Sequence, residues 1–308
     1  MHLFMKQLSL ITLLCLIYSC SEDASTPSGV EDEPSLFGYT FKTFNLNQEV
    51  LDSTYYELDN NRIISFSGLN LVSQQTSSAT FTYESDKISQ ISRFTDGALQ
   101  SRRTFQYSGD DLTELLIEIN NCYHKISFDY TAADTIKVEH RGSNDGIDFD
   151  IQFADSKIVL DANDNRIYFE DFDYANQESS AVQMDFDVNN NPISETFLTD
   201  FGNGLNPTFT NTLTFESSRN TLYEINENTY GKRTLMLLYH LQTNAVNQIN
   251  ARTIAPNNIG SFSSTFGSQF STVIINQIGL GDYAELNNFK TFINATLINE
   301  FELEFLIR

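Results

Sequence analysis

The densest group of potential metal ligands in the sequence is the acidic stretch YFEDFDYANQE. It places Glu170, Asp171 and Asp173 within four residues, and carboxylate oxygens are the ligands that Ca²⁺ prefers. Acidic side chains along the solvated edge of a strand give the same pattern without binding a metal. We therefore predict no metal and no cofactor, and we name these three carboxylates as the place where a cation would bind.

The segment before this stretch has the spacing that opens a calcium loop of the EF-hand type, Asp161-x-Asn163-x-Asn165. Arg166 stands where that loop needs a glycine for its turn, and Phe172 stands where it needs a bidentate glutamate. The segment therefore predicts a polar hairpin turn rather than a calcium site.

Residues for nucleophilic or acid–base catalysis are few. Beyond the amino-terminal segment the histidines are His124, His140 and His240, and the sequence contains no HExxH, Gly-x-Ser-x-Gly or Walker motif. His124 and His140 flank one predicted hairpin and could meet across it as two metal ligands, but we expect packing or surface histidines. Cys122 has no disulfide partner once the two amino-terminal cysteines are accounted for, and we expect a small buried side chain.

Aromatic side chains offer a third chemistry, the recognition of sugars or other flat ligands. The sequence has no tryptophan, but it has 14 tyrosines and 25 phenylalanines, and some of these recur at regular positions. The candidate ligand-facing aromatics are Tyr56, Tyr83, Phe105, Tyr107 and Tyr130. Burial of the same rings in a core is the alternative, because leucine, phenylalanine and valine fill the equivalent positions elsewhere.

These aromatics belong to an internal repeat. In each copy an apolar residue, any residue and a second apolar residue precede a polar turn, and another apolar residue follows five or six places later. The copies are Tyr56-x-Leu58 with Ile63, Phe81-x-Tyr83 with Ile88, Phe105-x-Tyr107 with Leu112, Phe128-x-Tyr130 with Ile136, Ile151-x-Phe153 with Ile158, and Phe186-x-Val188 with Ile193. Over the first five copies the period is 23 to 25 residues, which is typical of a repeat architecture.

Each copy predicts a β-hairpin. Alternation puts Phe105 and Tyr107 on one face of a strand, and the following Ser-Gly-Asp-Asp reverses the chain. Leu112 and Leu115 are an odd number of residues apart, so either Leu112 packs under the turn or a bulge separates the two. Because each hairpin leads directly into the next, the hairpins should form an antiparallel meander.

The pattern resembles the tyrosine-aspartate (YD) hairpin repeats, and particularly their relatives in surface lipoproteins of the Bacteroidota, many of which have no defined function. The similarity covers residues 55–225. The turn glycine that is common in those repeats is missing from most copies here. The resemblance implies an architecture of β-hairpins and no particular chemistry.

The repeats and the rest of the chain predict a single all-β domain over 37–308. Regular repeats occupy 55–225, one short helix is predicted near 233–249 from leucines at helical spacing, and strand-like stretches return at 261–276 and 289–307. A sheet of some fifteen strands does not stay flat. We therefore predict one large curled antiparallel sheet, a trough or barrel-like form, with the helix plugging or covering one end.

The first residues have the features of an export signal. Residues 1–19 carry one lysine and an apolar core too short to cross a bilayer, which is typical of a signal peptide. Ile17-Tyr18-Ser19-Cys20 resembles a bacterial lipobox, which implies that Cys20 carries lipid. Residues 20–36 are predicted to be a disordered tether, and its opening Ser-Glu-Asp is similar to the signals that send Bacteroidota lipoproteins to the cell surface. We predict an outer membrane lipoprotein that is exposed on the cell surface.

The formal net charge of −23 argues against binding to nucleic acid or to anionic lipid headgroups. Two three-residue segments around Ser53 and Thr135 resemble the O-glycosylation sites of exported Bacteroidota proteins.

Two functions remain after these exclusions. The leading hypothesis is a non-enzymatic binding or scaffold module, held to the membrane through lipid on Cys20, that presents a curved sheet to an unknown extracellular ligand or protein. The alternative is a hydrolase that acts on an extracellular polymer through two carboxyl groups about 5–9 Å apart in a cleft. An aromatic-lined trough without converging acids favours binding. The lipobox and the acidic, polar strands disfavour a membrane-spanning barrel. The oligomeric state is left open.

Overall fold

The computed structural model describes residues 36–132, 135–239, 241, 251–265, 270–278, 284–293 and 296–307. All of these belong to one compact unit, Leu36–Arg308. The predicted signal peptide, Cys20 and most of the predicted tether lie outside the described residues.

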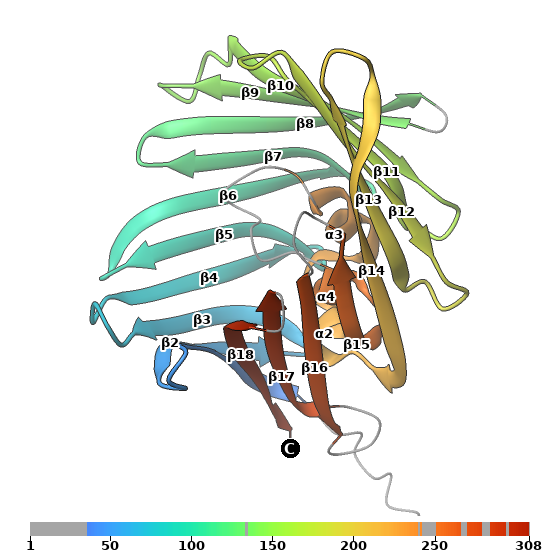
Figure 1. The fold of residues 1–308 in the computed structure, drawn as a ribbon. Helices are drawn as coiled ribbons and strands as arrows, with labels where there is room; N and C mark the ends of the chain where they lie inside the picture. Colours follow the sequence, from blue (N-terminus) through green and yellow to red (C-terminus); the bar gives the residue numbers. More distant parts are fainter. Residues whose placement is uncertain are drawn as a thin grey trace, which may run out of the picture. The chain divides into compact units, whose positions relative to one another are not determined.

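The described residues form one antiparallel sheet of 18 strands, shown in Figure 1. The first nine are β1 (Leu36–Phe44), β2 (Val50–Asp59), β3 (Arg62–Asn70), β4 (Thr76–Glu84), β5 (Lys87–Thr95), β6 (Ala98–Ser108), β7 (Asp111–Ile119), β8 (Cys122–Ala132) and β9 (Thr135–Ser143). The other nine are β10 (Ile151–Leu160), β11 (Arg166–Asp173), β12 (Glu178–Phe186), β13 (Pro192–Asp200), β14 (Leu205–Arg219), β15 (Asn257–Ser264), β16 (Phe270–Ile278), β17 (Ala284–Ile293) and β18 (Thr296–Ile307).

Each strand pairs with the strand before it and the strand after it, and β1 pairs with both β2 and β18. Every strand therefore has a hydrogen-bonded partner on either side, which protects the strand edges from pairing with other chains. The prediction of an all-β fold built as one curled antiparallel meander is confirmed.

The tight turns use asparagine, aspartate and serine in the left-handed conformation. Asn60 and Asn61 join β2 to β3 with φ of 50° and 59°, and Ser85 and Asp86 join β4 to β5 with φ of 50° and 64°. Two successive positive φ values are typical of the type I′ turn, whose twist suits a two-residue hairpin. Short polar side chains tolerate this conformation, so these copies form the turn without glycine.

A β-bulge follows the turn in the regular copies. Gln106 pairs with Glu114 while Tyr107 pairs with Leu112, so one residue of β7 has no opposite partner. The hairpins β2–β3 and β4–β5 shift register at the same place. The bulge lets Leu112 and Leu115 face the same side, and both are fully buried. The bulge that their odd spacing allowed is therefore present.

Two of the predicted copies are wrong. Ile151 and Ile158 lie in a single strand, β10, and the chain turns only after that strand ends at Leu160. Val188 lies in the loop between β12 and β13 and is 98% exposed. In that loop the carboxylate of Asp187 accepts two backbone N–H groups and occupies the inside of the turn, which leaves the valine outside.

The described residues contain three helices, α2 (Thr221–Tyr230), α3 (Lys232–Leu238) and α4 (Ala251–Ile254). Figure 1 shows them inside the curve of the sheet. None of these helices has the length and apolar character needed to span a bilayer.

The sequence analysis missed helix α2, whose first half lies within the repeats predicted over 55–225 and whose second half lies before the helix predicted near 233–249. The side chain of Asn220 caps its first turn by accepting the N–H groups of Leu222 and Tyr223. Gly231, with a φ of 76°, ends α2 and separates it from α3.

The single helix predicted near 233–249 is too long. Helix α3 ends at Leu238 because Tyr239 takes an extended conformation, and residues 242–250 lie outside the described residues. The ring of Tyr239 packs under the guanidinium of Arg166, 4.5 Å from its centre, and its hydroxyl donates to the carboxylate of Glu195 on β13. These contacts hold the chain against the sheet and prevent a further helical turn.

The hydrophobic core lies between the helices and the inner face of the sheet. Ile88 and Leu112 from the strands pack with Ile225 from α2 and with Leu237 and Leu238 from α3, and all are 0–1% exposed. Alternate residues on the same strands, such as the glutamates of β7, face away from this core. The predicted helix plug is thus a set of helices that covers the inner face of the sheet.

Candidate functional site

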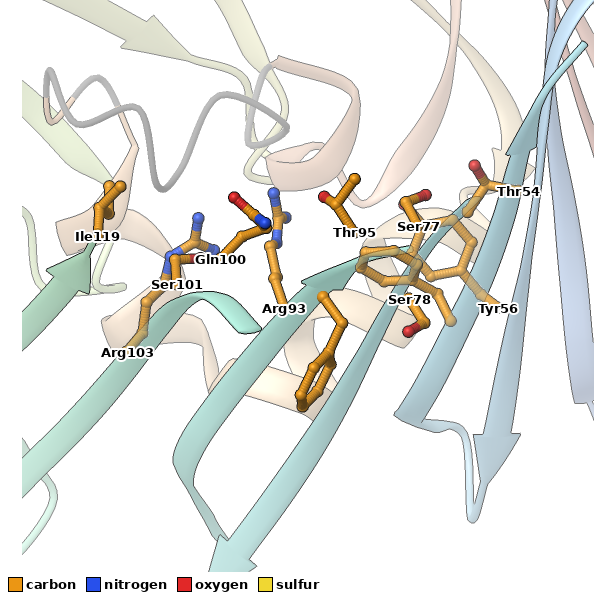
Figure 2. A pocket seen from close by; sticks show the side chains of 12 residues that line it. Thr54, Tyr56, Ser77, Ser78, Arg93, Thr95, Gln100, Ser101, Arg103 and Ile119 are labelled. Carbon is orange, nitrogen blue, oxygen red and sulfur yellow. The ribbon is translucent and has the colours of Figure 1, made fainter. Parts of the chain in front are cut away.

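A cavity of about 380 Å³ lies on the inner face of β2–β7, beside the hydrophobic core. Its size is in the range of small-molecule sites. Figure 2 shows the side chains that form it. The lining consists of hydroxyl, amide, guanidinium and apolar side chains, and these are Thr54, Tyr56, Phe66, Ser77, Ser78, Arg93, Phe94, Thr95, Gln100, Ser101, Arg103 and Ile119. None of these described lining residues is a carboxylate.

One wall of the cavity depends on the absence of a side chain. A Cβ atom added to Gly68 on β3 would lie 2.7 Å from the hydroxyl oxygens of both Thr54 and Ser77. Glycine therefore lets two hydroxyl groups from the neighbouring strands approach each other across β3. The result is a small polar wall next to the aromatic rings of Tyr56 and Phe66, which lie 5.3 Å apart.

Two arginines stand on neighbouring strands of the same cavity. Arg103 on β6 pairs with Ile91, and Arg93 on β5 pairs with Ser101, so the two arginines are diagonal neighbours on one face. Figure 2 shows both side chains extending from the sheet to the same side. Arg103 is only 6% exposed, and the guanidinium of Arg93 lies 5.6 Å from the ring centre of Phe66.

The electrostatic environment of this pair is unfavourable. Burial, together with the smaller effect of the positive charge of Arg93, lowers the pKa of Arg103 to about 10. The hydroxyl of Tyr230, at the end of α2, acts to raise the pKa of Arg103. Burial raises the pKa of Tyr230 itself, so this tyrosine is neutral near pH 7 and supplies no counter-charge. Two positive charges are thus held together without a compensating carboxylate in the cavity lining.

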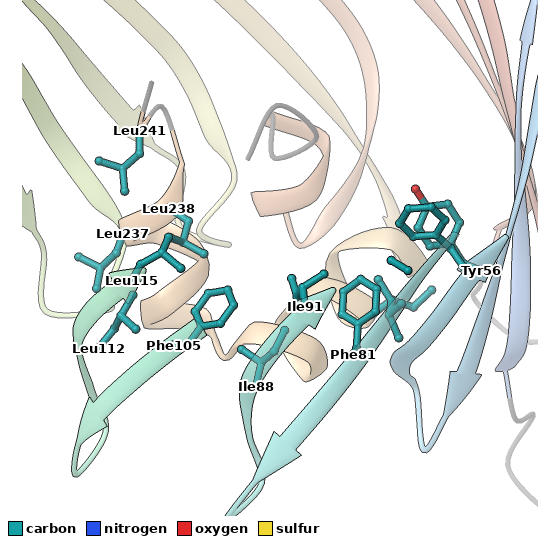
Figure 3. Close-up of a cluster of buried hydrophobic side chains, with 14 of the residues drawn as sticks. Tyr56, Phe81, Ile88, Ile91, Phe105, Leu112, Leu115, Leu237, Leu238 and Leu241 are labelled. Carbon is teal, nitrogen blue, oxygen red and sulfur yellow. The ribbon is translucent and has the colours of Figure 1, made fainter. Parts of the chain in front are cut away.

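The predicted ligand-facing aromatics lie at two depths. Tyr56 and Phe105 are 7% and 6% exposed and belong to the core cluster in Figure 3, and the ring of Tyr56 stacks on that of Tyr39. Tyr56 also lines the cavity, so among the five predicted aromatics it alone reaches the cavity lining that the structure describes. Phe105 contributes to the core instead.

Tyr83, Tyr107 and Tyr130 are half-buried at the rim of the core. The hydroxyl of Tyr83 donates to the backbone carbonyl of Ile63, and that of Tyr130 donates to the carbonyl of Leu112, at 2.7 and 2.8 Å. Both carbonyls lie at a bulge of an earlier hairpin. A cation lies 5.4–5.5 Å from the ring centre of each of the three tyrosines. These tyrosines therefore connect successive repeats, and little of each ring remains open.

His124 and His140 meet across the β8–β9 hairpin, with Nε2 of His124 3.3 Å from Nδ1 of His140. Nε2 of His140 lies 2.9 Å from the hydroxyl of Ser156, which donates to the carboxylate of Asp171 at 2.6 Å. Burial lowers the pKa of both histidines to about 4. The expectation of packing histidines fits this buried chain of hydrogen bonds. Within the described residues no three His, Cys, Asp or Glu side chains are grouped to hold a metal ion.

The acidic stretch does not converge on one point. Asp171 faces inward and is 8% exposed, whereas its neighbour Glu170 lies on the other face of β11 and accepts a hydrogen bond from Tyr168. Asp173 accepts the N–H groups of Ala175 and Asn176 in the next turn. Each of these carboxylates therefore has a local partner of its own.

The calcium-like segment is a hairpin turn, as predicted. One carboxylate oxygen of Asp161 accepts the N–H groups of Asn163 and Asn165, and the other accepts the side-chain amide of Asn165. The same amide also donates to Asn190 in the turn of the next hairpin. The polar residues of the motif therefore bind the backbone and connect two turns.

Cys122 is exposed, so the prediction of a buried side chain is wrong. It is the first residue of β8, directly after the turn at Asn120 and Asn121, where the strand begins outside the core. Ser53 lies inside β2 and Thr135 begins β9.

Sequence reasoning missed both arginines of the cavity. A signal for them was present, because Arg103 stands two residues before Phe105 and Arg93 stands two residues after Ile91. Alternation puts each arginine on the face of its core neighbour. A charged residue on the apolar face of a strand is the pattern that would have indicated them.

No protein-family model and no curated protein matches the sequence. Among solved structures, a porin-like protein from Bacteroides uniformis is similar with a TM-score of 0.44 and 10% identity over 89% of this chain and 96% of its own. A porin-like protein from Bacteroides vulgatus has a TM-score of 0.35 and 15% identity over 87% and 97%. The Tc holotoxin pore of Photorhabdus luminescens has a TM-score of 0.25 and 7% identity, over 88% of this chain and 17% of its own. At these values the similarities do not assign the chain to a family.

Proposed function

We propose that this protein is a non-enzymatic binding module of the cell surface, anchored by lipid on Cys20, that takes a small ligand into the cavity on the inner face of β2–β7. The observation that carries the proposal is the cavity itself. It has a ligand-sized volume of about 380 Å³, an aromatic wall, and hydroxyl and amide groups that can orient a polar ligand.

The chemistry of the lining favours binding over hydrolysis. Cleavage of a glycosidic bond needs two carboxyl groups that flank the substrate. The lining described above contains arginine, hydroxyl, amide and apolar side chains and supplies neither an acid nor a nucleophilic carboxylate. Two acidic residues near these strands have other roles, since Glu118 faces outward and pairs with Arg102, and Asp110 lies in a turn and pairs with Lys87.

The position of the cavity also refines the sequence-based hypothesis. Much of the inner face is covered by α2 and α3, so the ligand would not lie along the whole curved sheet. The cavity lies where the sheet carries Arg93, Thr95 and Ser101 next to this helical layer. A module of this kind would hold one small group of a ligand rather than present a broad surface.

Ligand binding can be tested by thermal unfolding of the mature chain with glucose, galactose, glucuronate, galacturonate, sulfate and phosphate as probes. A probe present at about ten times its Kd should raise Tm by about 3 °C. Ser77→Phe fills the cavity and should abolish the shift, whereas Thr82→Phe, on the outward face of the same strand, should keep it. The proposal is wrong if no probe raises Tm or if the shift survives in Ser77→Phe.

The anchor is tested separately by radiolabelled palmitate. The wild-type chain should incorporate the label in a bacterial host with lipoprotein export, and Cys20→Ala should not. Equal labelling of the two chains would contradict lipidation at Cys20 while leaving ligand binding to be judged by the thermal experiment.

A further inference from the structure

Arg93 and Arg103 differ from Arg102 and Arg233 in having no acidic partner among the described residues. Arg102, the residue before Arg103, faces outward and contacts Glu118 at 3.2 Å. Arg233 contacts both Asp111 and Asp164. No ion pair between described residues includes Arg93 or Arg103, although the sequence has 41 acidic residues.

One donor of each guanidinium is also unused. The Nε atoms of Arg93 and Arg103 are buried and have no hydrogen-bond partner among the described residues. A guanidinium carries five N–H donors in a planar fork that fits a carboxylate, sulfate or phosphate group. Buried donors without partners are uncommon in folded proteins, and a specific case calls for an explanation such as a missing ion.

The pair is also costly for the folded protein. Arg103 is 6% exposed, and burying a charge without a counter-charge is unfavourable. Diagonal neighbours on one face of a sheet are close enough to interact, so the two positive charges repel each other. An anion between the two arginines would offset their repulsion and accept hydrogen bonds from the unused donors.

The surroundings suit a polar ligand with one flat side. The hydroxyls of Thr95 and Ser101 and the amide of Gln100 line the cavity next to the arginines. The rings of Tyr56 and Phe66 form its aromatic wall. Sugar rings commonly lie against such rings while their hydroxyl groups bind polar side chains.

We propose that Arg93 and Arg103 together bind an oxyanion, a carboxylate, sulfate or phosphate group, on a ligand that occupies the cavity. This inference rests on the proposed function, because it names the chemical class of ligand for the same cavity. The net charge of −23 does not oppose it, since the field inside the cavity is set first by the two arginines that line it.

The inference is tested by isothermal titration calorimetry of the mature chain with glucuronate, galacturonate, sulfate and phosphate, and with glucose and galactose as neutral probes. At least one anionic probe should bind, and the neutral sugars should bind more weakly or not at all. Arg93→Met and Arg103→Met should each weaken binding of that anion by about tenfold or more. Arg102→Met removes an outward arginine from the same strand and should leave the affinity unchanged.

The pattern of probes identifies the source of the anion. Binding of the uronates without inorganic sulfate or phosphate indicates a carboxylate on a sugar, and the reverse indicates a sulfated or phosphorylated ligand. Arg103→Lys keeps the charge but loses the planar fork, so it should fold and bind with reduced affinity even if Arg103→Met does not fold. In the absence of any probe, Arg103→Met should be at least as heat-stable as the wild type, because the repulsion is gone.

Two results would overturn the inference. If an anion binds equally well to the wild type and to both methionine variants, its site is elsewhere. If a neutral sugar binds, is lost in Ser77→Phe and is unaffected by the arginine variants, the proposed function stands and the anion site does not. Absence of binding by all six probes would contradict both.

Discussion

Acidification should destabilise this protein through the buried pair His124 and His140. The hydroxyl of Ser156 donates its single hydrogen to Asp171, so Nε2 of His140 must donate to Ser156. Nδ1 of His140 is then an acceptor, and it takes the Nε2–H of His124 at 3.3 Å. Both rings are neutral in this arrangement. A proton on Nδ1 of His140 would place two donors against each other.

The size of the effect follows from the two pKa values. Each histidine has a pKa of about 4 in the folded protein, against the ordinary value of 6.5, because burial disfavours the charged ring. A depressed folded pKa means that this stability is fully present above about pH 6.5 and is lost as the pH falls toward 4. Between pH 7 and pH 5 the loss is about 2 kcal/mol for each histidine, and about 4 kcal/mol for the pair.

Urea unfolding at pH 7 and pH 5, followed by circular dichroism or tyrosine fluorescence, measures this difference. The comparison is between the wild type and the double variant His124→Gln/His140→Gln, which cannot titrate in this range. Burial raises the pKa of Asp171 and so gives a contribution of opposite sign, but this group is present in both proteins. Between pH 7 and pH 5 the free energy of unfolding of the wild type should fall by about 4 kcal/mol more than that of the variant. Equal losses in the two proteins would refute the reasoning.

Three further substitutions test the packing, the repeat and the cavity. Leu238→Ala should lower the free energy of unfolding by about 3 kcal/mol in urea, because the side chain is 1% exposed in the core; a loss under about 1 kcal/mol would contradict the packing. Tyr130→Phe removes the 2.8 Å hydrogen bond to the carbonyl of Leu112, so the free energy of unfolding measured in urea should fall by about 1 kcal/mol. An unchanged free energy of unfolding would contradict the role of this tyrosine in connecting repeats. Gly68→Ala should lower Tm and weaken probe binding, because the added Cβ would lie 2.7 Å from two hydroxyl oxygens of the cavity wall. Gly142→Ala is the control and should match the wild type, because its added Cβ would meet no atom nearer than 3.8 Å.

Much of the sheet could be predicted because a hairpin is a local structure. The alternation of Phe105 and Tyr107, the polar turn after them and the odd spacing of Leu112 and Leu115 together define two strands and a bulge, and all of these are present. Each feature depends on residues less than a dozen positions apart. The steady period then adds hairpin to hairpin, which gives the meander and its curl.

The predictions were wrong where one local sequence pattern is compatible with two different structures. Ile151 and Ile158 have the spacing of a repeat, but the segment between them pairs with β9 on both sides of a register shift at Phe153 and so remains one strand. Helix α2 begins where Asn220 caps it, within the range 55–225 over which the repeats were predicted. In both places the partner strand or the cap, and not the periodicity, decides the outcome.

The candidate site was harder to foresee than the fold. Alternation could place Arg93 and Arg103 on the apolar face of their strands, but it could not show that neither has an acidic partner. That depends on the register between β5 and β6 and on the position of Phe66 and Tyr56 from strands earlier in the chain. The carboxylates named as the place where a cation would bind show the converse, because the sequence neighbours Glu170 and Asp171 lie on opposite faces of β11.

The sequence by itself determined that the chain is built from repeated hairpins, because turns and alternation act over short distances. It also predicts an export signal and lipidation of Cys20, and both stay predictions. Only the tertiary structure decided that helices cover the inner face, that the histidines form a buried chain, and that two arginines share a cavity without a counter-charge. Each of these depends on the curl of the sheet, which brings together side chains from strands that the sequence keeps apart.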